Sequence, residues 1–280
     1  MRDGFLAAIL FATTLVGTTA RAEDASMTVE RARTTLRDLT SDPNVVGPVA
    51  DYLKRSKGVL IIPQLVKAGF VVGGEYGEGV LLARTGAGDW SSPAFYSLAA
   101  GSIGLQIGVE AKQVLLVVMT EKGLNSLMSD QVKFGADASI AVGPISGGLA
   151  ASSSGSLGAD FIAFSKSKGL FGGGALDGAV IQTQPEKNEA FYRTAATPRQ
   201  ILNQRRFTAG EARQLSASLS EFRRKSSILR FICPSRPGPG AARPPDGCPA
   251  RARQTHTPLS RGPPPPLPDP PPTLPLAPRR

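Results

Sequence analysis

Cysteine and histidine are absent from residues 1–224 and occur only later in the chain, at Cys233, Cys248 and His256. Their absence excludes thiol catalysis, zinc sites of the Cys/His type and Ser-His-Asp catalysis from residues 1–224. The sequence also lacks a Walker motif, a G-x-G-x-x-G motif and a G-x-S-x-G elbow. We therefore expect none of the nucleotide-binding or hydrolase classes that depend on these motifs.

Long hydrophobic runs are also missing. The apolar run Phe5–Val16 is shorter than the roughly 20 residues that a transmembrane helix needs. Ala20-Arg21-Ala22 follows it and fits the small-x-small pattern of signal-peptide cleavage. We predict a signal peptide at residues 1–22 and an exported protein, located in the periplasm or peripherally at the envelope membrane. An uncleaved anchor is the alternative.

Acidic residues are scarce near the C-terminus. Residues 225–280 hold 17 of the 24 prolines and 9 of the 32 basic residues but only 2 of the 22 acidic ones. The formal net charge of +10 is therefore mostly a property of this segment, and it does not indicate a nucleic-acid partner. We predict a disordered Pro/Arg-rich tail over 225–280. A frameshift product is one interpretation of it, and a polyproline or basic binding arm is another.

The remaining 202 residues, 23–224, are enough for one domain. Apolar spacing predicts helices over 28–39, 44–57, 120–128 and 209–223. A short strand is expected over 59–62, stopped by Pro63.

Between 69 and 181 short apolar runs alternate with glycines, as in GSIGLQIGVE and KQVLLVVM. This texture favours antiparallel strands, including one over 102–109 and a central one over 114–119. Glycines inside strands mark bends or close backbone approach. We therefore predict an α+β fold with a curved, mainly antiparallel, barrel-like sheet and flanking helices.

Basic residues in glycine-rich surroundings are the candidate binding residues. Lys166 and Lys168 precede Leu170 and Phe171 at the start of a glycine run. Lysines there would attract anionic headgroups, while the two apolar side chains would enter the membrane interface. A surface loop that folds Leu170 and Phe171 back into the core is the alternative.

Further basic residues would add attraction. Lys67 precedes a glycine-rich strand, and Lys54, Arg55 and Lys57 form a cluster at a predicted helix end. That cluster could instead only complement the helix C-terminus. The apolar stripe of the helix over 28–39, beside Arg31, Arg33 and Arg37, is consistent with an interfacial helix or with packing on the sheet.

Acidic residues of the body are scattered, and we interpret them as turn or surface carboxylates. They include Glu75, Glu78, Glu110, Asp137, Asp160 and Asp177. A hydrolase with two carboxylates that meet only in the fold remains an open alternative. We expect no metal and no cofactor.

Several motifs, in order, resemble the SYLF lipid-binding domain family. They are KGVLIIP (57–63), KAGFVVGG (67–74), GEGVL (77–81), WSSPAF (90–95), GLQIG (104–108), GADAS (135–139) and FSKSKGLFGG (164–173). The resemblance spans about 30–185, and its main departure is Phe164, where the family usually has tyrosine.

The resemblance implies a non-enzymatic module that binds anionic phospholipids at a membrane surface. Some eukaryotic members also bind actin, but the predicted signal peptide makes actin an unexpected partner here. The resemblance also implies an exported, membrane-associated protein, as bacterial members of the family look to be. The alternative is an envelope protein that acts through protein–protein contacts, and homo-oligomers remain open.

Overall fold

The computed structural model describes residues 3–69, 72–86, 89–103, 108–143, 158–167, 170–172, 176, 178–208 and 210–232. The helices are α1 (Asp3–Thr40), α2 (Pro43–Arg55), α3 (Glu121–Ser126), α4 (Pro185–Tyr192), α5 (Pro198–Leu202) and α6 (Gly210–Ile232). The strands are β1 (Gly58–Gly69), β2 (Val72–Ala83), β3 (Ala94–Ile103), β4 (Gly108–Val118), β5 (Gln131–Lys133), β6 (Ile140–Val142), β7 (Phe161–Ser167), β8 (Leu170–Gly172) and β9 (Val180–Thr183).

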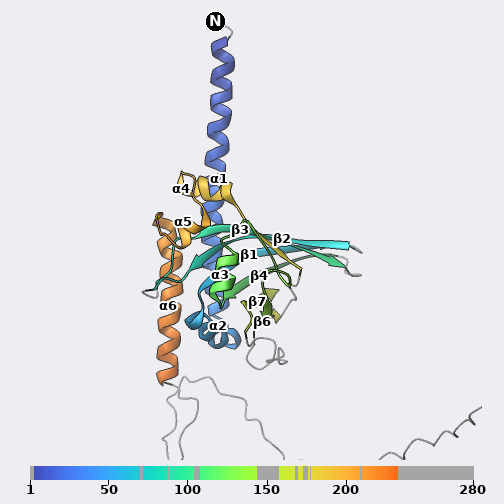
Figure 1. The fold of residues 1–280 in the computed structure, drawn as a ribbon, viewed down its shortest axis with the longest axis vertical. Helices are drawn as coiled ribbons and strands as arrows, with labels where there is room; N and C mark the ends of the chain where they lie inside the picture. Colours follow the sequence, from blue (N-terminus) through green and yellow to red (C-terminus); the bar gives the residue numbers. More distant parts are fainter. Residues whose placement is uncertain are drawn as a thin grey trace, which may run out of the picture. The chain divides into compact units, whose positions relative to one another are not determined.

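One curled sheet contains all of these strands, in the order β5-β9-β3-β2-β1-β4-β7-β6, with β8 paired to β7 (Figure 1). All of its strand pairs are antiparallel except β6 with β7. The predicted α+β class with a curved, mainly antiparallel sheet is confirmed. The strand expected over 114–119 is the interior part of β4, and its residues Val114–Val118 are all buried.

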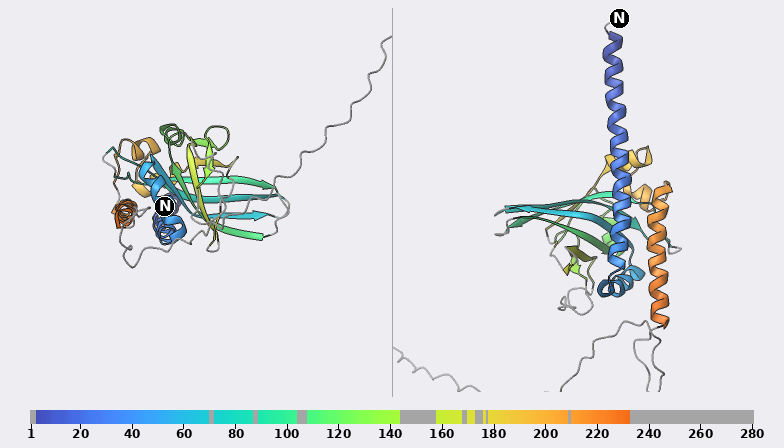
Figure 2. Two further views of the ribbon diagram at one scale, coloured as in Figure 1. Left: turned by 90° about the horizontal axis from the view of Figure 1, so that it is seen from below. Right: turned by 180° about the vertical axis from the view of Figure 1, so that it is seen from behind.

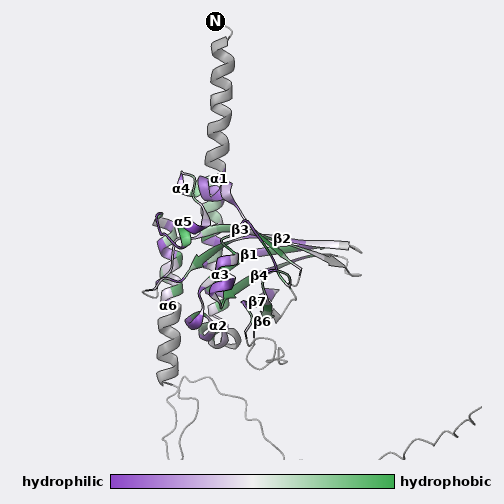
Figure 3. Cartoon of the chain, viewed as in Figure 1, coloured by the Kyte–Doolittle hydropathy of each residue, from purple (hydrophilic) through white to green (hydrophobic). Residues whose placement is uncertain are grey.

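Each face of the sheet carries its own hydrophobic core. The α1 face packs against α1, α2 and α6, while the α3 face packs against α3 and α5. Side chains alternate between the faces, so that Leu115 and Val117 belong to the α1 face and Leu116 to the α3 face. The most hydrophobic parts of the strands lie where these helices cover them (Figure 3).

Helix α1 packs on the sheet through an apolar stripe. Buried side chains recur every three or four residues from Ala25 through Val29, Ala32 and Leu36 to Leu39, which is the spacing of one helix face. The helix predicted over 28–39 is therefore part of a longer one. Cleavage after Ala22 would leave this whole stripe in place. None of the helices in the described ranges combines the length and the apolar character that a membrane crossing needs.

Strand β1 does not stop at Pro63, so the predicted strand end was wrong. The strand runs on to Gly69, and its pairing with β2 and β4 shifts between Ile61 and Leu65. This β-bulge accommodates a residue that cannot donate a backbone hydrogen bond. The bulge also places the side chains after it on the face opposite to the one that strict alternation from Ile61 would give.

Glycines at 77 and 79 allow β2 to lie close to this bulge. A Cβ on Gly79 would lie 2.2 Å from the Ile61 carbonyl oxygen, and one on Gly77 would lie 2.5 Å from that of Gln64. The expectation that strand glycines mark close backbone approach is confirmed at these two positions.

Two further predictions differ from the structure, and a third falls mostly outside the described residues. The strand expected over 102–109 is instead the end of β3 and the start of β4, and residues 104–107 lie outside the described part. Helix α6 continues to Ile232, past the predicted end at 223, because neither glycine nor proline interrupts it before Pro234. Residues 233–280, most of the predicted tail, also lie outside the described residues.

Candidate functional site

Strands β1 to β4 extend beyond the helices as a four-stranded arm (Figures 1 and 2). Directly paired residues share a face, so the strand register gives the rows of side chains across the arm. On the α1 face, two consecutive rows contain only small or apolar side chains and one tyrosine. They are Gly101, Gly74, Ala68 and Val109, and then Ala99, Tyr76, Val66 and Ala111.

The next row towards the helices is polar. It contains Ser97 and Glu78 from β3 and β2, Gln64 from the bulge, and Gln113 with its pair Lys166 from β4 and β7. The α1 face therefore changes from an apolar arm, through a polar row, to the buried core beneath α1.

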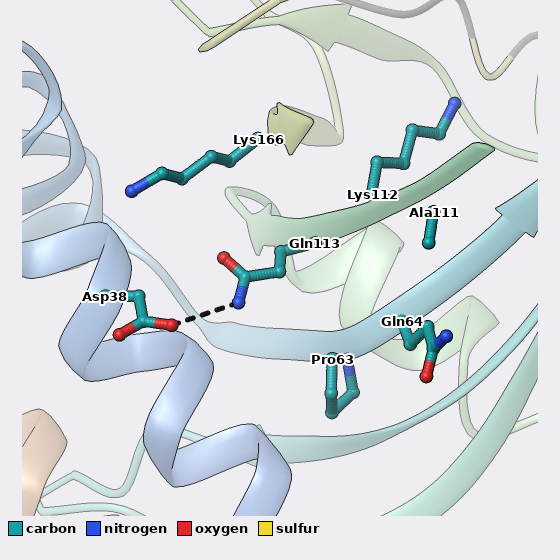
Figure 4. Close-up of a pocket in the computed structure, with 7 residues that line it drawn as sticks. All are labelled: Asp38, Pro63, Gln64, Ala111, Lys112, Gln113 and Lys166. Atoms are coloured by element: carbon teal, nitrogen blue, oxygen red, sulfur yellow. Dashed lines mark hydrogen bonds between the residues drawn. The ribbon is translucent and has the colours of Figure 1, made fainter. Parts of the chain in front are cut away.

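A cavity of about 300 Å³ lies at this polar row, between the sheet and α1 (Figure 4). Its lining consists of Asp38, Pro63, Gln64, Ala111, Lys112, Gln113 and Lys166. The Gln113 Nε2 donates a hydrogen bond of 3.2 Å to the Asp38 carboxylate. Figure 4 shows the Lys166 side chain extending over the cavity, whereas the Lys112 side chain points away from it. The cavity thus combines one ammonium, one carboxylate and two amides, with Ala111 continuing into the apolar rows.

The α3 face of the same arm is charged, and its charges pair with one another. The Glu75 carboxylate lies 2.9 Å from the Lys112 Nζ and 3.8 Å from the Lys67 Nζ. Ser167 donates a hydrogen bond to Glu110. Lys67 therefore lies on the opposite side of the sheet from Lys166, and the two do not contribute to one site.

A polar cluster at the same row joins β2 to α1 and α4. Lys187 forms ion pairs with Glu78 and with Asp24, the latter at 2.6 Å. Glu78 also accepts hydrogen bonds from Tyr76 (2.9 Å) and Gln184 (3.0 Å). Burial alone would raise the pKa of Glu78, but the hydrogen bonds from Lys187, Gln184 and Tyr76 outweigh it and lower that pKa. These contacts hold α4 and α1 at the base of the arm.

The other predicted basic residues lie elsewhere. Lys54 and Arg55 lie in the last turn of α2, and Lys57 lies just before β1. Lys67 is ten residues beyond Lys57 along the chain, roughly 30 Å away. Lys57 pairs with Glu121 at 2.9 Å, and the Arg55 guanidinium lies over the Tyr52 ring at 5.2 Å.

The predicted Leu-Phe loop is only partly described. Leu170 and Phe171 lie in β8, where Phe171 pairs with Lys166 and Leu170 with Ser167. Their side chains and all of Lys168 lie outside what the structure describes. Among the predicted site residues whose side chains the structure describes, Lys166 lines the cavity, whereas Lys54, Arg55, Lys57 and Lys67 do not.

The sequence reasoning missed Asp38, Gln113 and the apolar rows. Two uncharged stretches could have indicated the rows, since the chain has no charged residue between Lys67 and Glu75 or between Ala99 and Glu110. Asp38 could not have been found in this way, because its contact with Gln113 joins residues 75 positions apart.

Comparison with known proteins identifies relatives of this region. The family described as "Ysc84: Las17-binding protein actin regulator" matches residues 99–222, which include the cavity residues from Ala111 to Lys166. LAS seventeen-binding protein 3 of Saccharomyces cerevisiae is 35% identical over 158 residues, 55% of this chain and 34% of the relative. Protein YSC84 of the same organism is 36% identical over 156 residues, 55% of this chain and 33% of the relative.

A human relative, SH3 domain-containing YSC84-like protein 1, is 28% identical over 168 residues, 58% of this chain and 49% of the relative. The chain thus spans between a third and a half of the length of these curated relatives. What they share with it is one domain.

Proposed function

The chain carries a domain of the Ysc84 family, the SYLF domain, and on that premise we propose that it binds the headgroups of anionic phospholipids at a membrane surface. Relatives in this family are described as binding proteins rather than as enzymes, which supports a module without catalysis. The predicted signal peptide supports a periplasmic or envelope membrane as the place of binding.

The observation that carries the proposal is the cavity beside the apolar rows. Its volume of about 300 Å³ suits a small polar ligand such as a phosphorylated headgroup. Lys166 supplies a positive charge over the opening, and the side chains of Gln64 and Gln113 supply hydrogen-bond donors. Ala111 connects the cavity to an exposed apolar surface, so a headgroup held there would have the rest of its lipid on that side.

Lys166→Glu is expected to lower the affinity of the full-length chain for anionic vesicles by roughly 30-fold. One Lys near an anionic surface is worth about 1 kcal/mol, and reversing its charge doubles the change. The measurement is flotation with vesicles of phosphatidylcholine alone and of equal parts phosphatidylcholine and phosphatidylglycerol. Lys133→Glu is the matched control, because Lys133 is exposed on β5, away from the cavity.

Asp38→Asn is a second variant, and it should change the affinity for anionic vesicles in the opposite direction. Removing the cavity's carboxylate charge should raise the affinity for anionic vesicles, while the asparagine oxygen still accepts the hydrogen bond from Gln113. If Lys166→Glu and Lys133→Glu weaken binding equally, the effect is one of net charge and the site is not this cavity.

The second candidate function is a protein-binding module without a specific lipid. The description of the family as Las17-binding favours it, although that partner belongs to the relatives. Failure of the chain to float with any vesicle would put this function first.

A further inference from the structure

The apolar rows of the arm are exposed. Among the described residues, three large hydrophobic side chains are exposed, and two of them lie in these rows: Val109 at 74% and Tyr76 at 53%. Ala68, Ala99 and Ala111 beside them are exposed as well. A surface of this kind, bordered by a polar row, is typical of an interaction site rather than of a solvated sheet.

The arm has only this face available for burial. Its α3 face carries Glu75, Lys67 and Lys112, whose charges pair with one another. Burying that face in an apolar medium would require desolvating these charges, which costs several kcal/mol per ion. The α1 face carries no charged side chain in the two apolar rows from Gly101 to Val109 and from Ala99 to Ala111.

We propose that the α1 face of the arm enters the interfacial layer of a lipid bilayer, with Val109 and Ala68 in the deeper row. This proposal rests on the proposed function. It adds that the protein contacts the interfacial layer of the bilayer as well as the headgroups. The two rows are about 7 Å apart along the strands, which suits the roughly 5–10 Å depth that interfacial elements reach. Tyr76, with an apolar ring and a hydroxyl that donates to Glu78, lies at the boundary between the apolar and polar rows.

Charge and shape favour a bilayer over a protein as the occupant. Lys166 stands on the same face one row further in, where lipid phosphates would lie above an inserted arm. Most residues in the two rows are glycine or alanine. The surface therefore has few of the large side chains that contribute most of the binding energy in protein interfaces. A fluid bilayer needs no such side chains.

A fluorescent probe on the arm tests this insertion. Val109→Cys in a full-length Cys233→Ser/Cys248→Ser chain is labelled with the environment-sensitive dye NBD, and Asp130→Cys, an exposed site outside the arm, is the matched control. On adding phosphatidylcholine/phosphatidylglycerol vesicles, the dye at position 109 should shift to shorter wavelength and brighten severalfold. The dye at position 130 should not change.

A second variant needs no label. Val109→Asp should weaken flotation with the same vesicles by roughly tenfold, since it removes apolar contact and adds a negative charge. Val109 is exposed, so circular dichroism should show an unchanged fold.

The outcomes separate the two proposals. Flotation with no dye change at position 109 and no effect of Val109→Asp would overturn arm insertion and leave headgroup binding intact. Absence of flotation would overturn both. A dye shift at position 109 without vesicles, together with a dimer in light scattering that Val109→Asp dissociates, would assign this face to a second copy of the chain and overturn insertion.

Discussion

Gly79→Ala is expected to destabilise the domain by about 3 kcal/mol, because the new Cβ cannot be accommodated without moving backbone. An ideal Cβ at position 79 lies 2.2 Å from the Ile61 carbonyl oxygen and 2.9 Å from the Ile61 carbonyl carbon. Neither neighbour is a flexible side-chain end, so β1 and β2 must separate at the bulge. Urea unfolding followed by circular dichroism measures the loss.

Gly101→Ala is the matched control for that experiment. Gly101 also lies within a strand, but a Cβ there meets nothing within 4 Å. Its unfolding free energy should stay within about 0.5 kcal/mol of the wild type. Equal stability of the two variants would mean that the strands do not approach closely at Gly79, and the register that defines the rows of the arm would then be in doubt.

Asp160→Ala should destabilise the domain by about 2–4 kcal/mol, since it removes a buried carboxylate that accepts three hydrogen bonds. The Asp160 carboxylate accepts hydrogen bonds from the Thr120 hydroxyl at 2.5 Å and from the Ser139 hydroxyl and backbone N–H at 2.9 and 3.1 Å. Thr120 is the N-cap of α3, so one carboxylate joins that helix to the chain before β6. Asp130→Ala, at an exposed aspartate, is the control and should change stability little.

The Asp160 contribution should also depend on pH. Burial acts to raise the pKa of Asp160, but the hydrogen bonds from Thr120 and Ser139 outweigh it and lower that pKa below its ordinary value. A depressed folded-state pKa gives stability that is present above the unfolded-state pKa of about 3.9 and is lost as the pH falls through the folded-state pKa. The difference in unfolding free energy between wild type and Asp160→Ala should therefore narrow below about pH 4. A difference that is constant with pH would contradict this origin.

Local patterns in the sequence were sufficient for much of the fold. The stripe Val29, Ala32, Leu36 and Leu39 predicted a packed helix because helical spacing depends only on near neighbours. The apolar run at 114–118 predicted a buried strand, because a continuous apolar run is also a local feature of the sequence. Helices α4 and α5 were missed, since both are short and lack a long apolar period.

The faces of β1 could not be predicted, because they depend on the bulge. Strict alternation places Lys67 on the same face as Ile61. The register shift after Ile61 puts Leu65 into the α3-face core instead, and Lys67 follows it. Lys166 lies in β7, which pairs with β4 without a shift, but its position beside α1 depends on pairings between residues far apart in the chain.

The most direct test of the central claim is flotation of the unmodified full-length chain with neutral and with anionic vesicles at low and at high salt. The predicted result is flotation with the phosphatidylglycerol-containing vesicles at low salt and its loss as salt rises, because exposed charges are screened over about 8 Å at physiological ionic strength. An equal floating fraction with both vesicle types, or binding to anionic vesicles that salt does not weaken, would contradict recognition of anionic headgroups.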